Sequence, residues 1–421
     1  MSNVVVVGLG YVGLPLSVRA AEVGFTVIGV DSDIRKVQAL AQGLSYVEDV
    51  SSDRVADVTA RGAFTPRLTY HGFEPHETWE VGIITVPTPV VIENGTKVPD
   101  LSYIKDAARF LGTWMQPGAT VVLESTTYPG TTEEVVIPLL EEYSRMREGI
   151  DFHVGFSPER IDPSNEINTF TTTPKIVAGT SFEAQAIIAG FYSAVVDTVV
   201  PVSTPRTAEM AKIFENTFCQ VNIALVNELA VVCSKMGLDV NEVLDAAATK
   251  GHAFMRFRPG PGVGGHCIPV DPLYLTWKTR QEFGVPFRFA ELADEINSNM
   301  PKHVVGRANE LLDGLHNKRV LVLGLAYKAG VSDVRESPAI EILRLLDESG
   351  AVVSICDPHV GYFPGPWARL GEEEAVQRAG EFDLVVIVTN HQDVDYEALG
   401  VNARLVLDTR NQMKTGRVVG L

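Results

Sequence analysis

A glycine pattern follows directly on a run of four valines near the amino terminus. Val4–Val7 is followed by Gly8, Gly10 and Gly13 in the spacing GxGxxG, and a second β-branched run ends at Asp31. In a strand–turn–helix unit the first glycine permits the tight turn, the second lets the backbone approach a pyrophosphate, and the third lets helix and strand pack closely. The pattern therefore predicts a dinucleotide-binding unit within a mostly parallel sheet covered by helices.

The acidic residue that ends the second run selects between the two nicotinamide dinucleotides. Asp31 can accept hydrogen bonds from an adenosine ribose, and its charge disfavours a 2′-phosphate, so we expect NAD rather than NADP. Lys36 is expected to assist, although a solvated helix lysine is the alternative. The other expected cofactor contacts lie in the turn and at later strand ends: Tyr11, Val12, Pro87, Thr88, Ser125 and Thr126.

The rest of the chain predicts an α/β fold of two Rossmann-like, doubly wound domains joined by a long central helix and a small helical domain. Short β-branched runs alternate with helical stretches before residue 204, and a stretch without Pro or Gly after Pro205 predicts one long helix from Thr204 to about Gly237. Shorter helices are expected to about Asn299, and a second strand pattern begins at Lys318. We expect domains at 1–203, 204–300 and 301–421.

Charge and cysteine content exclude several classes of partner. The chain has 35 basic and 53 acidic residues, a net charge of −18, which repels phosphate backbones and anionic lipids, so no nucleic-acid or membrane partner is expected. Its 4 cysteines show no paired spacing and favour a reducing compartment. The most apolar later stretch, Ala184 to Val196, is too short to span a membrane, and a cytoplasmic location is expected.

A glycine-rich stretch over residues 259–272 contains the best candidate for a nucleophile. Cys267 precedes a helix predicted over Leu273–Glu282, and a helix N-terminus favours the thiolate. The alternatives are a buried small hydrophobe for Cys267 and a helix cap for Asp271. His266 has no second ligand pair at a suitable spacing, so no metal site is expected.

Three further segments carry candidate catalytic groups. Lys212 and Asn216 are four residues apart on the long helix and share one face, although helix lysines are usually solvated. The loops Glu124–Thr131 and Ser157–Arg160 follow predicted strands, where α/β sheets bind ligands. The alternatives are threonines that cap a helix near Thr131, and a simple ion pair between Glu159 and Arg160.

Together these segments resemble the nucleotide-sugar 6-dehydrogenases of the UDP-glucose/GDP-mannose dehydrogenase family over essentially the whole chain. The resemblance is carried by six blocks: Gly8–Gly13 with Asp31, Glu124–Thr132, Ser157–Asp162, Lys212–Asn216, Gly260–Asp271, and Gly324–Lys328 with Asp333–Pro338.

The resemblance implies a four-electron oxidation of a sugar CH₂OH to a carboxylate with two NAD⁺. Cys267 would trap the aldehyde as a thiohemiacetal that is then oxidised to a thioester. Lys212, with Asn216 beside it, would deprotonate the alcohol and stabilise oxyanions. Glu159 would be the preferred general base in thioester hydrolysis, and Asp271 would orient Lys212 and water. The implied catalytic set is Cys267, Lys212, Asn216, Asp271, Glu159 and Thr126.

The carboxy-terminal domain would hold the nucleotide diphosphate, with Lys328 and Arg335 as the anion partners and Arg410 as a weaker candidate. The central helices would form a homodimer, and Arg258 or Arg256 would reach the site of the partner subunit. The implied substrate contacts are Glu159, Arg160, Lys212, Asn216, Arg258, Gly264, Lys328 and Arg335.

The block Gly-Gly-His-Cys-Ile-Pro-Val-Asp-Pro resembles the branch that oxidises UDP-N-acetylglucosamine or UDP-N-acetylmannosamine. UDP-glucose and GDP-mannose enzymes more often carry Gly-Gly-Ser-Cys with a lysine before the aspartate, whereas this chain has His266 and Val270 there. UDP-glucose oxidation to UDP-glucuronate is the alternative. Two further alternatives are a single-step hydroxyacid dehydrogenase, which needs no nucleophilic cysteine, and a non-enzymatic NAD-responsive binding protein.

Overall fold

The computed structural model describes residues 3–69, 77–93, 96–161, 167–265 and 267–421. His266 and Asp162, which were named above, lie outside these residues. The chain divides into two compact units: the first comprises Met1–Glu215 and Leu273–Glu282, and the second comprises Asn216–Pro272 and Phe283–Leu421.

The first unit is built on one eight-stranded sheet. Its strands are β1 (Asn3–Val7), β2 (Thr26–Asp31), β3 (Phe64–Leu68), β4 (Val81–Ile84), β7 (Thr120–Leu123), β8 (His153–Phe156), β9 (Lys175–Gly179) and β10 (Val199–Pro201). Their order is β10-β9-β8-β7-β4-β1-β2-β3, and β9 runs antiparallel to β8 while the other neighbours pair in parallel. The carboxyl ends of β1, β2, β4, β7 and β8 therefore share one edge, where ligands bind in such sheets.

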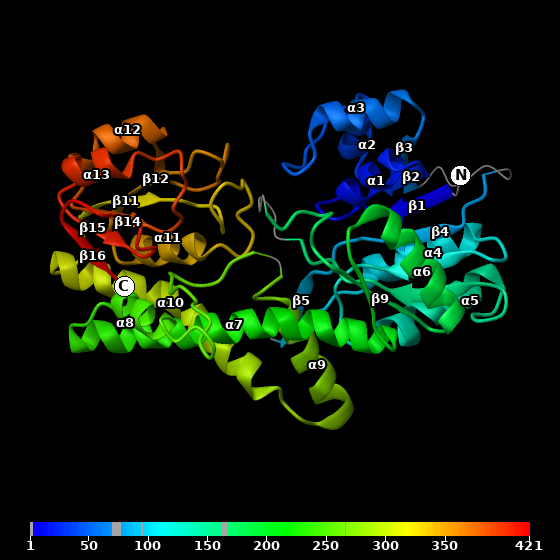
Figure 1. The fold of residues 1–421 in the computed structure, drawn as a ribbon. Helices are drawn as coiled ribbons and strands as arrows, with labels where there is room; N and C mark the ends of the chain where they lie inside the picture. Colours follow the sequence, from blue (N-terminus) through cyan, green and yellow to red (C-terminus); the bar gives the residue numbers. More distant parts are fainter. Residues whose placement is uncertain (1–2, 70–76, 94–95, 162–166, 266) are drawn as a thin grey trace. The chain divides into compact units, whose positions relative to one another are not determined.

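Helices cover both faces of this sheet (Figure 1). They are α1 (Gly13–Glu22), α2 (Ile34–Ala41), α3 (Ser52–Ala60), α4 (Ser102–Trp114), α5 (Ile137–Ser144) and α6 (Phe182–Val195), and a π-helical turn over Thr132–Val136 precedes α5. Leu14 of α1 and Phe191 of α6 share one apolar cluster with Val4 and Val6 of β1. Leu111 of α4 lies against the opposite face at Gly82. The expected doubly wound arrangement is confirmed.

The second unit carries a six-stranded sheet whose strands all run in parallel. The strands are β11 (Arg319–Leu323), β12 (Val352–Cys356), β13 (Ala368–Arg369), β14 (Leu384–Ile387), β15 (Val406–Asp408) and β16 (Val418–Gly420), in the order β13-β12-β11-β14-β15-β16. α10 (Arg288–Leu312) and α11 (Pro338–Glu348) pack on one face, and α12 (Glu372–Gln377) and α13 (Tyr396–Asn402) pack on the other. A second Rossmann-like sheet is therefore present, as expected.

Of the two longest helices, one agrees with the length expected from the sequence and the other is longer. α7 (Pro205–Met236) matches the single long helix that was expected, and α8 (Val240–Ala248) follows it. The expectation that the helices end near Asn299 is wrong, because α10 continues through Pro301. Proline removes one helix hydrogen bond, but Pro301 is buried, and Val304 and Ala308 beyond it pack into the core of the second unit.

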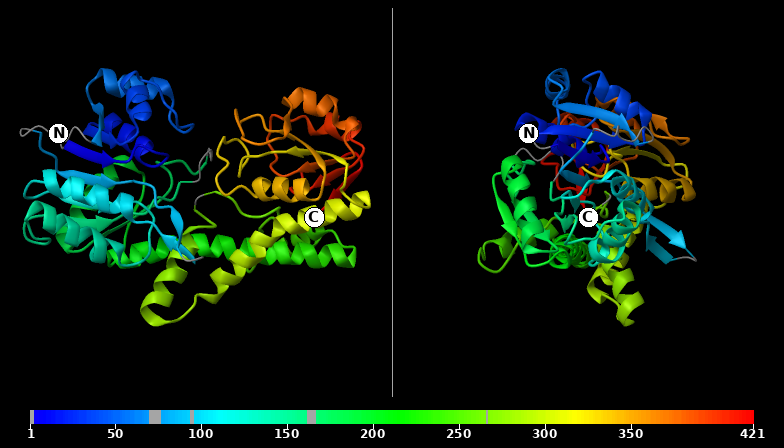
Figure 2. Two further views of the ribbon diagram at one scale, coloured as in Figure 1. Left: turned by 180° about the vertical axis from the view of Figure 1, so that it is seen from behind. Right: turned by 90° about the vertical axis from the view of Figure 1, so that its right-hand side faces the viewer.

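Several strands at or outside the sheet edges were not expected from the sequence. β3, β13 and β16 are edge or near-edge strands with polar residues or short lengths. β5 (Val90–Glu93) and β6 (Thr96–Pro99) form a separate antiparallel hairpin in the first unit (Figure 2). Alternating burial is absent in β5, which is mostly exposed, so its sequence lacks the signal that identifies an internal strand.

Among the described residues α7 is the one helix that is long and apolar enough to cross a membrane. Its mean hydropathy reaches 1.4 over the relevant window, of which 39% is buried. The stretch from Ala184 to Val196 lies mostly in α6, a helix of 14 residues, which is too short to span a membrane, as expected. Length and composition are weak criteria, because core helices of globular proteins also satisfy them, and α7 carries buried Glu209 and Lys212.

Candidate active site

The three glycines of the amino-terminal turn have separate structural roles. Gly8 has φ +99°, donates its N–H to the carbonyl of Val30 at 2.7 Å, and would place a Cβ 2.8 Å from the carbonyl oxygen of Thr85. A Cβ on Gly13 would lie 1.8 Å from the carbonyl oxygen of Gly8. Apart from Gly10 and its two chain neighbours, no atom of the described residues lies within 4 Å of the Cβ position of Gly10. The turn and the packing therefore use Gly8 and Gly13, and the backbone at Gly10 is open to a ligand.

Asp31 is buried at the end of β2 and is only partly saturated with donors. It accepts the backbone N–H of Leu9 and of Asp33, each at 2.9 Å, and the ammonium of Lys36 at 3.2 Å. A carboxylate has about four acceptor positions, so these described donors leave one for a ribose hydroxyl. Lys36 pairs with Asp31, which brings two of the expected cofactor residues together.

The loops after β4 and β7 contain the next expected cofactor residues. Pro87 is exposed, and the carbonyl of Thr88 accepts the hydroxyl of Tyr274 on α9 (Asp271–Phe283). The Ser125 hydroxyl donates to the carbonyl of Val86 at 2.7 Å, which ties the two loops together. Within residues 121–130, Thr126 is the one residue that is not buried, so its side chain is the part of this loop that is available to a ligand.

Glu209 on α7 caps the helical segment that follows this loop. Its buried carboxylate accepts the backbone N–H of Gly130 and Thr132 and the hydroxyl of Thr132, the latter at 2.7 Å. Burial raises the pKa of Glu209. The alternative in which a threonine caps this helix is wrong, because Thr131 makes no side-chain cap. Sequence reasoning missed Glu209, although it stands one helical turn before Lys212.

Glu159 lies on the loop after β8, and both of its carboxylate oxygens are engaged. One oxygen accepts the backbone N–H of Arg160 and Ile161, each at 2.6 Å, and the other accepts the ammonium of Lys175 at 2.9 Å. The guanidinium of Arg160 binds Glu215 at 2.9 Å. The simple Glu159–Arg160 ion pair is therefore wrong, and Lys175 is a partner that the sequence did not indicate.

Lys212 and Asn216 stand one turn apart on α7. Lys212 is 8% exposed, so the alternative of a solvated helix lysine is wrong. The side-chain amide of Asn216 donates to the carboxylate of buried Asp271, the first residue of α9. The N–H of Asp271 donates to the carbonyl of Cys267 at 2.8 Å, and Cys267 is half-buried. Cys267 thus lies in the turn that leads into α9, as expected.

The glycine-rich stretch packs against the loop that follows β11. A Cβ at Gly264 or Gly265 would lie 2.8 or 2.9 Å from the side chain of Tyr327. These glycines are therefore required by close contact with the loop after β11. The N–H of Gly260 donates to the amide oxygen of buried Asn227 at 2.8 Å, and Asn227 donates to Asn297 at 2.9 Å. Sequence reasoning missed both asparagines.

The expected diphosphate contacts lie around this stretch. The carbonyl of Arg335 accepts the N–H of Gly265 at 3.0 Å, while its guanidinium forms an ion pair with Asp333. Lys328 directly follows Tyr327 and is half-buried. Arg410 donates to the carbonyl of Val388 at 2.7 Å, and burial lowers the pKa of Arg410 to about 10.

Asp357, at the end of β12, occupies the position in the second sheet that Asp31 occupies in the first. It accepts the backbone N–H of Leu325 and Ala326 and the ring N–H of His391 at 3.0 Å, as well as the N–H of His359 and Val360. Although burial opposes it, these hydrogen bonds lower the pKa of Asp357 well below its usual range. Five donors saturate this carboxylate.

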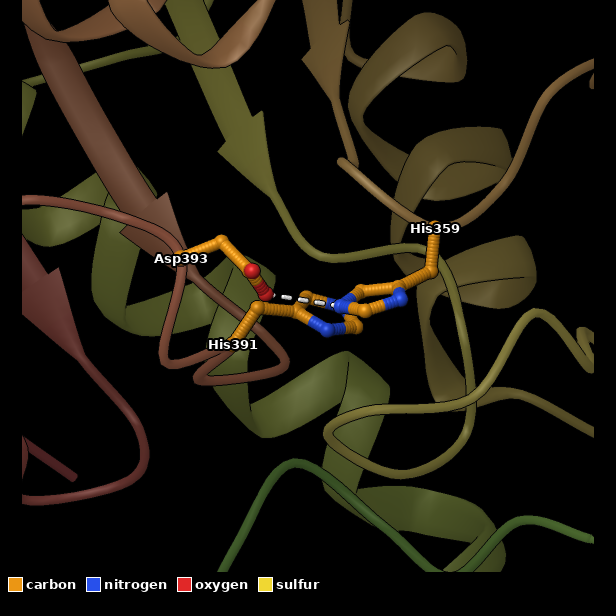
Figure 3. Close-up of side chains that lie close together, drawn as sticks. All are labelled: His359, His391 and Asp393. Atoms are coloured by element: carbon orange, nitrogen blue, oxygen red, sulfur yellow. Dashed lines mark hydrogen bonds and ion pairs between the residues drawn. The ribbon is translucent and has the colours of Figure 1, made fainter. Parts of the chain in front are cut away.

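His391, His359 and Asp393 form a cluster beside Asp357 (Figure 3). The Nε2 atom of His359 lies 2.7 Å from Asp393. The two imidazole rings stack with centroids 4.8 Å apart and an interplanar angle of 30°. The Nε2 atom of His391 already pairs with the carboxylate of Asp357. The cluster supports the loop after β11, because Nδ1 of His391 accepts the N–H of Gly330 at 3.3 Å.

Two Rossmann-like sheets in one chain, with a dinucleotide turn on the first and basic side chains on the loop after β11 of the second, define an NAD-dependent nucleotide-sugar dehydrogenase. The chain belongs to the UDP-glucose/GDP-mannose dehydrogenase family. The NAD binding domain of the family matches residues 2–196 of this chain, the central domain of the family matches residues 206–299, and the UDP binding domain matches residues 321–415. NAD is therefore the cofactor, and the partly open Asp31 and the bare backbone at Gly10 fit it.

Individual relatives agree with this assignment. The UDP-N-acetyl-D-glucosamine 6-dehydrogenase of Pseudomonas aeruginosa is 37% identical over 85% of this chain and 83% of its own length. The solved UDP-N-acetylmannosamine dehydrogenase of Pyrococcus horikoshii has a TM-score of 0.86 at 31% identity, with 99% of this chain and 98% of that chain covered. A UDP-glucose dehydrogenase from Pyrobaculum islandicum has a TM-score of 0.87 at 26% identity, with 100% and 97% covered.

Proposed function

We propose that the chain oxidises the C6 hydroxymethyl group of UDP-N-acetylglucosamine or UDP-N-acetylmannosamine to a carboxylate in two NAD-dependent steps. The observation that carries the proposal is the hydrogen bond between Asn216 and Asp271. It ties α7, which bears the buried Lys212, to the turn that holds Cys267. A lysine–asparagine pair serves alcohol oxidation, and a thiol in the same arrangement adds the means to hold the aldehyde.

The first oxidation needs a base at the hydroxyl and an acceptor for hydride. When bound, NAD⁺ accepts a hydride from C6 in each of the two oxidations. Lys212 takes the hydroxyl proton while C6 becomes an aldehyde, and the amide of Asn216 donates to the oxygen on which charge develops. The thiolate of Cys267 then adds to C6, and the aldehyde oxygen takes a proton from Lys212 to become the hydroxyl of a thiohemiacetal.

The second oxidation converts this thiohemiacetal to a thioester. Its hydroxyl proton returns to Lys212, and C6 stays bonded to the sulfur of Cys267. Water then adds to C6, Glu159 takes a proton from it, and the bond between C6 and sulfur breaks. One water and two NAD⁺ are consumed for each sugar, and two NADH, one carboxylate and three protons are released.

The experiment is a count of NADH formed per nucleotide sugar consumed. UDP-N-acetylglucosamine, UDP-N-acetylmannosamine and UDP-glucose are supplied separately with NAD⁺, and the sugar product is identified by mass spectrometry. Two NADH per sugar with a uronic acid product supports the proposal. One NADH per substrate indicates a single-step dehydrogenase, and none across the panel indicates a binding protein.

UDP-glucose is the second candidate substrate. The observation that favours it is the likeness of the backbone to a UDP-glucose dehydrogenase, which is as high as the likeness to a UDP-N-acetylmannosamine dehydrogenase. The fold thus does not discriminate between the sugars. The replacement of the usual serine and lysine near Cys267 by His266 and Val270 favours an N-acetylhexosamine.

We further infer a cytoplasmic homodimer formed through α7. Exposed apolar residues recur every four or seven positions along this helix: Met210, Phe214, Phe218, Leu225, Val232 and Met236. A second copy of this stripe is its self-complementary partner. Arg256 already pairs with Asp245, whereas Arg258 is exposed and available to reach across. Light scattering should give the mass of two chains, and Phe214→Asp should give that of one.

A further inference from the structure

A buried lysine joins two strand ends at the edge of the first sheet. Because β9 runs antiparallel to β8, its first residue lies at the edge where β7 and β8 finish. That residue is Lys175, whose side chain is 4% exposed. It binds Glu124, directly after β7, and Glu159, after β8. Since a buried ammonium requires compensating charge, both carboxylates are needed to hold it.

The surroundings of Lys175 exclude water and fix its direction. The ring of Tyr192 lies 5.5 Å and the ring of Phe170 lies 5.8 Å from its ammonium nitrogen. The side chain of Glu124 is fully buried, and one of its oxygens has no hydrogen-bond partner among the described residues. Glu124 therefore faces Lys175 at a place that solvent does not reach.

The same contacts determine which part of Glu159 is free to react. Its Oε1 atom accepts two backbone N–H groups, and its Oε2 atom accepts Lys175. With about two acceptor positions on each oxygen, the described donors leave one position, on Oε2. The proton acceptor is thus the oxygen that Lys175 holds.

We propose that Lys175 is a positioning residue that fixes the reactive oxygen of Glu159 for thioester hydrolysis, and that Glu124 keeps Lys175 in place. The inference rests on the proposed function, in which Glu159 takes one proton from the attacking water. That proton goes to Oε2 of Glu159, the water oxygen bonds to C6, and sulfur leaves with the electron pair of its bond to C6. Lys175 keeps its three protons throughout.

The charge balance supports this role. Although burial opposes it, the two carboxylates raise the pKa of Lys175, so the ammonium stays charged. Burial raises the pKa of Glu124 to about 7. Near neutral pH Glu124 is therefore partly protonated, and the charge of Lys175 acts chiefly on Glu159.

The test is Lys175→Met, followed by stopped-flow measurement of NADH with the substrate that the wild type uses. We expect the first NADH to form at the wild-type rate and steady turnover to fall by about 10- to 100-fold, the range for a misplaced general base. Cys267 should accumulate a thioester, visible as added mass on the intact protein.

The matched control is Lys278→Met. Lys278 is also buried between two glutamates, Glu134 and Glu282, in the first unit. Lys278→Met should leave both the rate of the first NADH and the rate of steady turnover close to those of the wild type. A second variant, Lys175→Met with Glu124→Leu, removes both buried charges and covers the case in which the single variant does not fold. It should show the same stalled thioester.

Two results would overturn the role of Lys175. One is an equal slowing of the first NADH and of turnover, which indicates a general structural effect. The other is the same loss in a Glu159→Gln background, where a residue that acts through Glu159 should add nothing. A wild-type protein that oxidises no nucleotide sugar overturns the proposed function itself, whereas an active wild type with an unaffected Lys175→Met variant overturns this inference alone.

Discussion

The carboxylate of Glu209 accepts the backbone N–H of Thr132 at 2.9 Å, and so joins α7 to the loop that follows β7. The same carboxylate also accepts the N–H of Gly130 and the hydroxyl of Thr132. One buried side chain thus fixes the loop that carries Thr126 to the helix that carries Lys212.

Replacing Glu209 by Ala should destabilise the protein and slow its reaction. Loss of the carboxylate leaves three donors unsatisfied, and a cost of about 2–4 kcal/mol in the free energy of unfolding is expected. Urea denaturation measures the loss. Glu133→Gln, which removes a partner of the exposed Arg206, is the control and should cost less than about 1 kcal/mol. Equal losses in the two variants would contradict the capping role.

Replacing Cys267 by Ser should abolish acid formation while sparing the protein fold. A serine hydroxyl is a far weaker nucleophile than a thiolate, so turnover should fall by at least about 10³-fold. Product analysis should find aldehyde and no uronic acid. Cys219→Ser changes another half-buried thiol, on α7, and should keep most of the activity. Wild-type yields of acid from the Cys267 variant would rule out the covalent route.

Replacing Asp31 by Asn should weaken the preference for NAD over NADP. The change keeps one acceptor oxygen for Leu9 but removes the charge that repels a 2′-phosphate. The ratio of kcat/KM values for the two cofactors should fall by about 10- to 100-fold. The measurement is initial rates with each cofactor, and Asp33→Asn, at the cap of α2, is the control. An unchanged ratio would mean that another residue selects the cofactor.

The buried Glu124 should make stability depend on pH. Burial raises its pKa from the ordinary value of 4.5 to about 7. Because the pKa of Glu124 is higher in the folded than in the unfolded protein, its protonation favours the folded state. That stabilisation is fully present below about pH 4.5 and is lost as the pH rises through 7. Relative to Glu124→Gln, the wild type should therefore lose about 1–3 kcal/mol between pH 5 and pH 8.

Denaturation of both proteins at a series of pH values provides the comparison. Glu142→Gln, an exposed change on α5, should leave the pH dependence of the wild type intact. A difference between wild type and Glu124→Gln that stays constant or grows with pH would contradict the assigned shift.

Sequence patterns were sufficient to predict the features that are formed by residues close together in the chain. The strand before Gly8, the turn around it and Asp31 lie within about 30 residues, so their spacing alone predicted the dinucleotide unit. The long helix α7 was also predictable, because it lacks the residues that end helices. The end of α10 was not, since packing beyond Pro301 outweighs the local effect of proline.

Long-range partners could not be predicted in the same way. Lys175 is 16 residues from Glu159 and 51 residues from Glu124, and the three meet only because β9 reverses direction in the sheet. Glu209 and Thr132 are separated by 77 residues. Their side chains are ordinary surface types, and burial alone distinguishes them. The sequence shows the glycine-rich stretch itself, but it does not show that Gly264 and Gly265 pack against Tyr327, which lies much further along the chain.

The saturated carboxylate of Asp357 has a consequence for the order of events in a catalytic cycle. Because its described contacts leave no acceptor for a ribose, Asp357 cannot hold a dinucleotide as Asp31 can, and we expect the two hydrides to leave on successive cofactor molecules bound at the first sheet. NADH then has to dissociate and NAD⁺ has to bind between the first and the second oxidation of the sugar. The covalent bond to Cys267 would then retain the partly oxidised sugar in the site while the cofactor is exchanged.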